Sequence, residues 1–282
     1  MKLSYSTWGM QTTPIDEAVR HCAALGYDGL ELTIIPGWPT DAATMRVNER
    51  RRIRQLYDDA GLELCGISGN VGLLQGDPSA EEADAARFRG YLDFAAELQQ
   101  PGERLIVTTV SGGAPGDWDA RKYQFVETAG RLAAYANERG VMVGIEPHAG
   151  HALRTPDDAV WLIEQVDSPG MTIHFDISHF NVQGIPMEES VAKLTPISMH
   201  THVKDERGIF PDHDFLIPGE GEIDYPRYLR LMSDAGYDGH IVVEISLMVQ
   251  RRPDYDPLAA AAQSYDVLSR AFETARIARS QG

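Results

Sequence analysis

Four side chains that can bind a metal ion stand in or directly after short apolar runs of the sequence. They are Glu146 in VMVGIEPH, Asp176 in MTIHFDISHF, His202 in ISMHTHVKD and Glu244 in HIVVEIS. Charged side chains rarely occupy strand interiors unless they are paired or bound to a cation. Three carboxylates and an imidazole that converge on one point would need a positive ion to offset the repulsion between the acids. The four residues therefore suggest a metal enzyme, provided that the strands converge.

Strand-like and helix-like segments alternate along the chain, eight of each in strict order. The predicted strands are Lys2–Thr7, Gly29–Thr33, Glu63–Ser68, Arg104–Val110, Met142–Glu146, Thr172–Asp176, Ser198–Val203 and His240–Ile245. The predicted helices are Ile15–Leu25, Asn48–Ala60, Ala80–Leu98, Ala120–Arg139, Pro156–Val166, Met187–Leu194, Tyr225–Ala235 and Leu258–Arg279. Eight such units in 282 residues fit a single α/β domain, a (β/α)₈ TIM barrel over residues 1–282. An open doubly wound sheet is the alternative, but the first turn after a strand, residues 7–14, carries no glycine-rich phosphate loop.

The predicted helix ends have local chemical support. Thr13, Ser79 and Thr155 each precede an acidic residue by three positions, as in a capping box. Helix-like runs are followed by glycines, which suit a left-handed C-cap; these are Gly26, Gly61, Gly140 and Gly236.

The longer segments follow strands, whereas most connections from helix to strand are short. Active sites of TIM barrels lie on the side of the loops that follow strands. Residues i and i+2 of a strand share a face, so an inward Asp176 brings His174 with it and an inward His202 brings His200. The four metal-binding candidates would thus meet at the carboxyl ends of the strands.

Composition excludes several classes of protein. The net charge of −17 disfavours binding to nucleic acid or to an anionic membrane. No apolar run approaches the roughly 18 residues of a membrane span, and the first ten residues read as a strand instead of a signal peptide. We therefore expect a cytoplasmic protein. The two cysteines, Cys22 and Cys65, read as small core residues without a disulfide.

The motifs GIEPH, FDISH, HTHVKD and VVEIS resemble the strand ends of the xylose-isomerase-like (β/α)₈ superfamily, the sugar phosphate isomerase/epimerase group. Two further segments support the resemblance, LGYDGLEL at residues 25–32 and PGEGEIDYPRYLRLMSDAGYDG at residues 218–239. The resemblance covers essentially the whole chain. It indicates the superfamily but does not select one member of it.

The resemblance implies that Glu146, Asp176, His202 and Glu244 bind one divalent metal ion. Three carboxylates and one imidazole form a mostly hard ligand set, which suits Mn²⁺ first, with Mg²⁺, Co²⁺ or Zn²⁺ as alternatives. The resemblance also implies that His179 and the residues around Arg207 line the substrate pocket.

Such an ion can polarise a carbonyl group and stabilise the enediolate that forms when the neighbouring C–H loses its proton. Glu146 and Glu244 come from strands that are three apart, so we expect them to flank a substrate as catalytic base and acid. Four weaker candidates for contact with the substrate are Trp8, Glu31, His148 and Lys204. For Lys204 the alternative is an ion pair with Asp205 or Glu206, and for Glu31 it is a loop anchor.

The sequence therefore predicts an isomerase or epimerase of a sugar, ketose or keto-polyol that works through a metal-bound enediolate. A lyase or dehydratase that uses the same enolate on a keto-inositol or 3-keto-glycoside is the close alternative. An apurinic endonuclease is remote because the chain is acidic, and a non-catalytic sugar-binding subunit is remote because the ligand set is intact. The sequence leaves open whether the chain forms a homo-oligomer.

Overall fold

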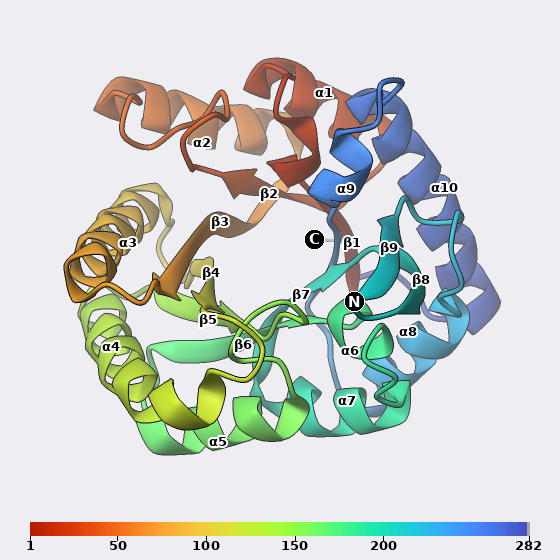
Figure 1. Ribbon diagram of the computed structural model, residues 1–282. Helices are drawn as coiled ribbons and strands as arrows, with labels where there is room; N and C mark the ends of the chain where they lie inside the picture. The colour runs from red at the N-terminus through yellow and green to blue at the C-terminus, as the bar shows by residue number, and fades with distance from the viewer. Residues whose placement is uncertain (281–282) are drawn as a thin grey trace.

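The computed structural model describes residues 1–280, in which eight parallel strands close into a barrel surrounded by helices (Figure 1). The barrel strands are β1 (Lys2–Ser6), β2 (Gly29–Thr33), β3 (Glu63–Leu74), β4 (Ile106–Gly112), β5 (Met142–Glu146), β6 (Met171–Asp176), β7 (Ser198–Val203) and β10 (His240–Val243). They follow one another around the barrel in chain order, and β10 pairs with β1 to close it. The prediction of a (β/α)₈ barrel is confirmed.

The helices lie outside the barrel wall. The long helices are α1 (Ile15–Leu25), α2 (Val47–Ala60), α3 (Pro78–Leu98), α4 (Trp118–Glu138), α5 (Pro156–Val166), α7 (Met187–Leu194), α8 (Tyr225–Asp234) and α10 (Pro257–Ala275). The short ones are η1 (Thr7–Met10), α6 (Ser178–Asn181), η2 (Thr195–Ile197) and α9 (Leu247–Gln250). Each predicted strand and long helix is present, and most of the predicted ends are correct; the largest shift is at the end of β3, predicted at Ser68 and observed at Leu74.

The helix caps agree with the sequence in part. The Thr155 hydroxyl accepts a hydrogen bond from the Asp158 amide (3.2 Å), and Gly26 and Gly61 adopt the left-handed conformation at helix ends. Two predicted caps are wrong. Helix α3 begins earlier and is capped by Asp77, and α1 begins after Pro14 without a side-chain cap.

The segment after β7, expected to be a loop, forms a hairpin of β8 (Asp205–Ile209) and β9 (Asp212–Leu216). The hairpin lies on the side where the barrel strands end, near α8 and α9 in Figure 1. Asp205 holds the segment that follows, because its carboxylate accepts hydrogen bonds from the amides of Gly219 (2.7 Å) and Ile223 (3.1 Å).

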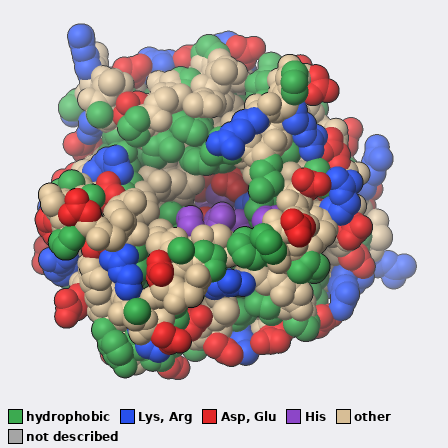
Figure 2. Space-filling model, viewed as in Figure 1, with side chains coloured by type: hydrophobic (Ala, Val, Ile, Leu, Met, Phe, Trp, Pro, Cys, Tyr) green, Lys and Arg blue, Asp and Glu red, His purple; other side chains and the backbone are tan. Residues whose placement is uncertain are grey.

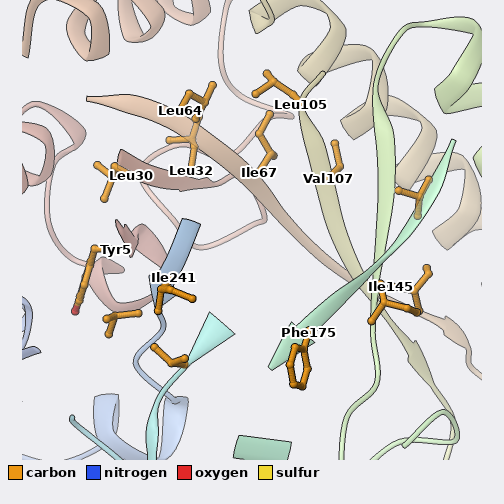
Figure 3. Packing of buried hydrophobic residues seen from close by; sticks show 14 of the residues in the cluster. Tyr5, Leu30, Leu32, Leu64, Ile67, Leu105, Val107, Ile145, Phe175 and Ile241 are labelled. Carbon is orange, nitrogen blue, oxygen red and sulfur yellow. The ribbon is translucent and has the colours of Figure 1, made fainter. Parts of the chain in front are cut away.

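Side chains alternate along each strand between the helices and the barrel interior. The outward ones are apolar and pack in the main core, as Figure 3 shows for Leu30, Leu32 and Phe175. Their neighbours in the chain include Glu31 and His174, which are buried but polar. The inward side chains at this level of the barrel are therefore polar, and they can form a site of charged groups instead of an apolar core.

The surface agrees with the expectations from composition. No helix in the described part of the chain is long and apolar enough to cross a membrane. The basic run at residues 50–54 is a paired helix face: Arg50 and Arg52 bond to acids of neighbouring helices, and Arg54 bonds to Glu103 in the loop before β4. Cys22 and Cys65 are both free thiols, as predicted.

Candidate active site

Parallel register brings the candidate residues to one end of the barrel. Asp176, the last residue of β6, lies beside His202 on β7. Glu146 ends β5, the next strand on one side, and Glu244 follows β10 on the other. Four carboxyl and imidazole groups from consecutive strands of the barrel thus share one level.

Three of these groups form a tight cluster. One ligand atom from each of Glu146, Asp176 and His202 lies within 4.8 Å of the other two. Glu244 stands at the edge of the cluster, with its Oε1 atom 3.6 Å from His202 Nδ1. All four side chains are buried.

Two atoms of the cluster are buried without a partner. Glu146 Oε1 and His202 Nδ1 have no hydrogen bond to any residue that the structure describes. Buried polar atoms are normally satisfied, so each such atom calls for an explanation. An oxygen and an imidazole nitrogen that face the same point are a suitable donor pair for a divalent ion. The residues present therefore fit a metal site.

Lys204 supplies a positive charge beside the same cluster. Its ammonium group donates to Asp176 Oδ2 and to Glu244 Oε2, the latter at 2.6 Å. The alternative for Lys204, an ion pair with Asp205 or Glu206, is not formed in the described structure. Asp205 instead accepts from backbone amides, and Glu206 accepts from Asn181 at 3.0 Å.

A layer of polar residues lies one step deeper in the barrel. Glu31 accepts from His200 Nε2 (2.9 Å) and from His202 Nε2 (3.0 Å). With Nε2 held by Glu31, the Nδ1 atom of His202 is directed toward the cluster. Gly66 on β3 makes room for this layer, because a Cβ there would lie 2.7 Å from the His200 ring.

Mutual electrostatics fix the charge of these groups. Burial alone would raise the pKa of Asp176, but Lys204 and His179 outweigh it and lower the pKa to about 2. Burial alone would lower the pKa of His202, whereas Glu31 and Glu244 raise it to about 9. Burial would also raise the pKa of Glu146, but His179 and Lys204 lower it. Asp176 and Glu146 are therefore ionised at neutral pH.

Three histidines extend the site above the cluster. His179 Nε2 lies 3.6 Å from Glu146 Oε1 and 3.8 Å from Asp176 Oδ2. The rings of His148 and His179 are 3.8 Å apart, and that of His151 stacks on His148 at 4.3 Å. Burial and the neighbouring His179 lower the pKa of His148 well below its usual value, so that His148 is neutral.

A cavity of about 720 Å³ opens above these residues. Figure 2 shows histidines and acidic groups at the bottom of a central hollow on this face. Six of the residues predicted from the sequence line the cavity, namely Trp8, Glu146, His148, His179, Lys204 and Glu244. Asp176 and His202 lie directly behind this lining, at most 1% exposed.

Two predicted residues lie elsewhere. Glu31 is fully buried beneath His202 and does not line the cavity, so its position fits support of the cluster instead of contact with a substrate. Arg207 lies on the hairpin, where it pairs with Asp214 at 2.8 Å and lines a separate hollow of about 410 Å³. The hairpin turns Arg207 away from the cavity, which the sequence offset from His202 did not reveal.

Several residues of the cavity wall were not predicted from the sequence. His213 and Phe215 reach it from β9, and the Phe215 ring lies 4.9 Å from that of His179. Arg251 lies at its exposed rim. The alternation of residues 212–216 was a signal for a strand, and recognising the hairpin would have placed His213 and Phe215 on one face.

A family model described as xylose isomerase-like TIM barrel matches residues 19–271 of the chain. Among curated proteins, the chain is 26% identical over 265 residues to fructoselysine 3-epimerase of Escherichia coli O157:H7, covering 90% of the chain and 93% of that protein. It is 31% identical over 298 residues to inosose dehydratase of Klebsiella pneumoniae subsp. pneumoniae, covering 93% and 90%. Both relatives are matched over nearly their whole length.

Among solved structures, a D-psicose 3-epimerase determined in the presence of D-fructose superimposes with a TM-score of 0.78. The identity is 17%, and the match covers 98% of this chain and 99% of that one. At this identity the likeness concerns the fold.

Proposed function

The chain belongs to the xylose isomerase-like TIM barrel family, and from this premise we propose that it is a divalent-metal-dependent isomerase or epimerase of a sugar or keto-polyol. One observation carries the proposal. Glu146 and Glu244 line the same cavity from strands on either side of Asp176 and His202. The relatives named as a 3-epimerase and as a dehydratase both support chemistry on a sugar-like substrate.

We assign the ion to Glu146, Asp176, His202 and Glu244. When bound, a divalent ion supplies positive charge that polarises a carbonyl group and lowers the pKa of the adjacent C–H. Mn²⁺ is our first choice, since the set has three hard oxygen ligands and one imidazole. His202 enters this set through Nδ1, because Glu31 occupies Nε2.

The two glutamates perform the proton transfers. Glu146 is ionised and its Oε1 atom accepts no hydrogen bond from the residues that the structure describes, so it is in the form that accepts a proton from the substrate. Glu244 lies across the cluster, where its carboxyl group can deliver a proton to the opposite face or to a neighbouring carbon. His179 Nε2, at 3.6 Å from Glu146 Oε1, offers a donor to substrate oxygen.

The size of the cavity bears on the substrate. A volume of about 720 Å³ lies within the usual range for drug-sized ligands, roughly 300–1,000 Å³. Trp8, Leu247 and Met248 line its wall and supply apolar surface. We therefore propose a sugar that carries a substituent, such as a glycoside or conjugate, in preference to a free ketose.

The second candidate is a dehydratase, which the match to inosose dehydratase favours. Both reactions begin with removal of the same proton. They part when the carbanion either regains a proton or expels a β-hydroxyl group, which takes a proton from Glu244 and leaves as water. The mass of the product separates them: an isomer has the mass of the substrate, and an elimination product has lost one water.

The test is proton exchange in D₂O, followed by NMR, on a panel of ketoses, inososes and 3-keto-glycosides with Mn²⁺ present. We expect deuterium at the carbon next to the carbonyl, and loss of about 10²–10⁴-fold in rate for Glu146→Gln and Glu244→Gln. Glu164→Gln, on the exposed side of α5, is the matched control. Normal turnover by either site variant with metal bound would refute the assignment.

A further inference from the structure

Lys204 stands out among the basic residues because its charged end is inside the protein. Its side chain is 2% exposed, and the ammonium group is held by Asp176 and Glu244. Lys204 therefore places its ammonium group within a cluster of acids.

The two acids that hold Lys204 are also two of the four residues to which we assign the divalent ion. The oxygen atoms involved are Asp176 Oδ2 and Glu244 Oε2. The other oxygen of Asp176 already accepts from the amide (2.9 Å) and hydroxyl (2.6 Å) of Ser178. Asp176 can thus offer only Oδ2 to an ion without breaking its bonds to Ser178, and Oδ2 already accepts a hydrogen bond from the Lys204 ammonium group.

The cavity beside Lys204 has room for its ammonium group. It lines the cavity of about 720 Å³, and its ammonium group lies 5.1 Å from the centre of the Phe215 ring. A turn of the flexible side chain toward the cavity would keep the charge near water and near an aromatic face. The ammonium can therefore leave the carboxylates without being stranded in apolar surroundings.

We propose that Lys204 is an internal counter-ion that competes with the divalent cation for Asp176 and Glu244, so that cation binding displaces its ammonium group into the cavity. This inference rests on the proposed function, because it takes the same four residues as the metal site. On this proposal, Lys204 neutralises Asp176 and Glu244 when no divalent cation is bound. The cation must displace Lys204 to bind, and its apparent affinity is therefore weaker. Two like charges in one buried site also repel each other.

The test compares Mn²⁺ binding to the native chain and to Lys204→Met by calorimetric titration. Met keeps much of the buried apolar stem and removes the charge. We expect Lys204→Met to bind Mn²⁺ more tightly, by on the order of tenfold to a hundredfold, because the ion no longer displaces an ion pair or meets a like charge. The matched control is Arg251→Met, which removes another cation of the cavity that does not bond to these acids.

A second measurement tests the inference even if Lys204→Met is unstable without metal. Thermal unfolding with and without saturating Mn²⁺ should show a larger gain in melting temperature for Lys204→Met than for the native chain, since its unpaired acids gain most from the ion. If the apoprotein does not fold, the variant is prepared with Mn²⁺ and transfer of the ion to a competing chelator is compared with that from the native chain. Slower transfer supports the inference, and equal or faster transfer contradicts it.

The outcomes separate this inference from the proposed function. Native binding of Mn²⁺ with equal or weaker binding by Lys204→Met overturns the competition and leaves the function standing. An equal gain in Arg251→Met also overturns it, because the effect would then be one of general charge. Binding by Lys204→Met alone supports the competition but contradicts a metal requirement in the native chain. No binding by either protein refutes the metal site itself.

Discussion

At the scale of single residues, Glu31 shows how a side chain remote from the substrate can set the geometry of the site. It accepts from both His200 and His202, and it is fully buried. Carboxylates that bond to the outer nitrogen of a ligand histidine fix the orientation and the tautomer of the ring. We therefore assign Glu31 a positioning role beneath the cluster.

We expect Glu31→Gln to lower the affinity for Mn²⁺ by about 10–100-fold, since His202 loses its carboxylate partner. Calorimetric titration measures the change. Glu63→Gln is the matched control, because Glu63 bonds to His240 at 3.0 Å at the opposite end of the strands. Native affinity in the Glu31 variant would show that the ring needs no such support.

Glu206 is a second buried acid, and its pKa makes stability depend on pH. It is 6% exposed, and its Oε2 atom has no hydrogen-bond partner among the described residues. Burial raises its pKa to about 8, with Asp205 adding to the effect and Asn181 opposing it. A raised pKa in the folded chain means that the stabilising contribution of the protonated acid is complete below the unfolded pKa of about 4.5. The contribution is lost as the pH rises to about 8.

A glutamine at position 206 does not ionise, so the variant does not lose this stability as the pH rises. We expect the free energy of unfolding of Glu206→Gln, relative to the native chain, to increase between pH 4.5 and 8 and then to level off, by about 1–3 kcal/mol in total. Urea unfolding at a series of pH values measures it. Glu164→Gln on the exposed side of α5 serves as the control. A difference that does not change with pH would mean that Glu206 titrates normally.

At the scale of elements, the hairpin of β8 and β9 forms part of the cavity wall through Phe210, His213 and Phe215, and the segment after it packs against the hairpin. Asp205 is 1% exposed and ties residues 217–223 to the hairpin through two backbone amides. Gly221 is required there, because a Cβ would lie 2.5 Å from the Asp205 carboxylate. One buried acid therefore fastens the segment after β9 to the hairpin.

We expect Asp205→Ala to lower the free energy of unfolding by about 1–3 kcal/mol per amide that loses its buried partner. Hydrogen exchange at the amides of Gly219 and Ile223 should speed up first. Asp212→Ala, at an exposed position of the same hairpin, should stay within about 0.5 kcal/mol of the native chain. Unchanged exchange at both amides in Asp205→Ala would show that other contacts hold the segment.

At the scale of the whole molecule, the two ends of the chain close the barrel. Strand β1 pairs with β10, and the amide of Ser280 donates to the carbonyl of Met1 at 3.0 Å. Loss of β10 would leave the backbone N–H and C=O groups on one edge of β1 and of β7 without their partners. We therefore propose that residues 1–282 form one domain.

A chain that ends at residue 239 should accordingly fail to fold, because it lacks the closing strand and α10. Limited proteolysis and circular dichroism measure the outcome. The control is a circular permutant that joins the original ends and opens the exposed segment at residues 114–116, which keeps every strand pair. A protease-resistant fragment of residues 1–239 would contradict a single domain.

The sequence determined the architecture, because the alternation of apolar runs and helical patterns is a local property. Three strands, Gly29–Thr33, Met142–Glu146 and Ser198–Val203, have the predicted bounds. The same periodicity placed Glu146 and Asp176 at the carboxyl ends of their strands, and parallel strands bring such ends together.

The tertiary structure decided which groups touch. Lys204 bonds to Asp176 and Glu244, which lie 28 and 40 residues away, and not to its neighbours in the chain. Arg207 faces away from the cavity because the hairpin turns it outward, and Glu31 lies beneath the cluster because of its partners on β7. The sequence thus named the chemical groups, since their types and spacing are local. Only the closed barrel set their partners and charges, since these depend on contacts between residues far apart in the chain.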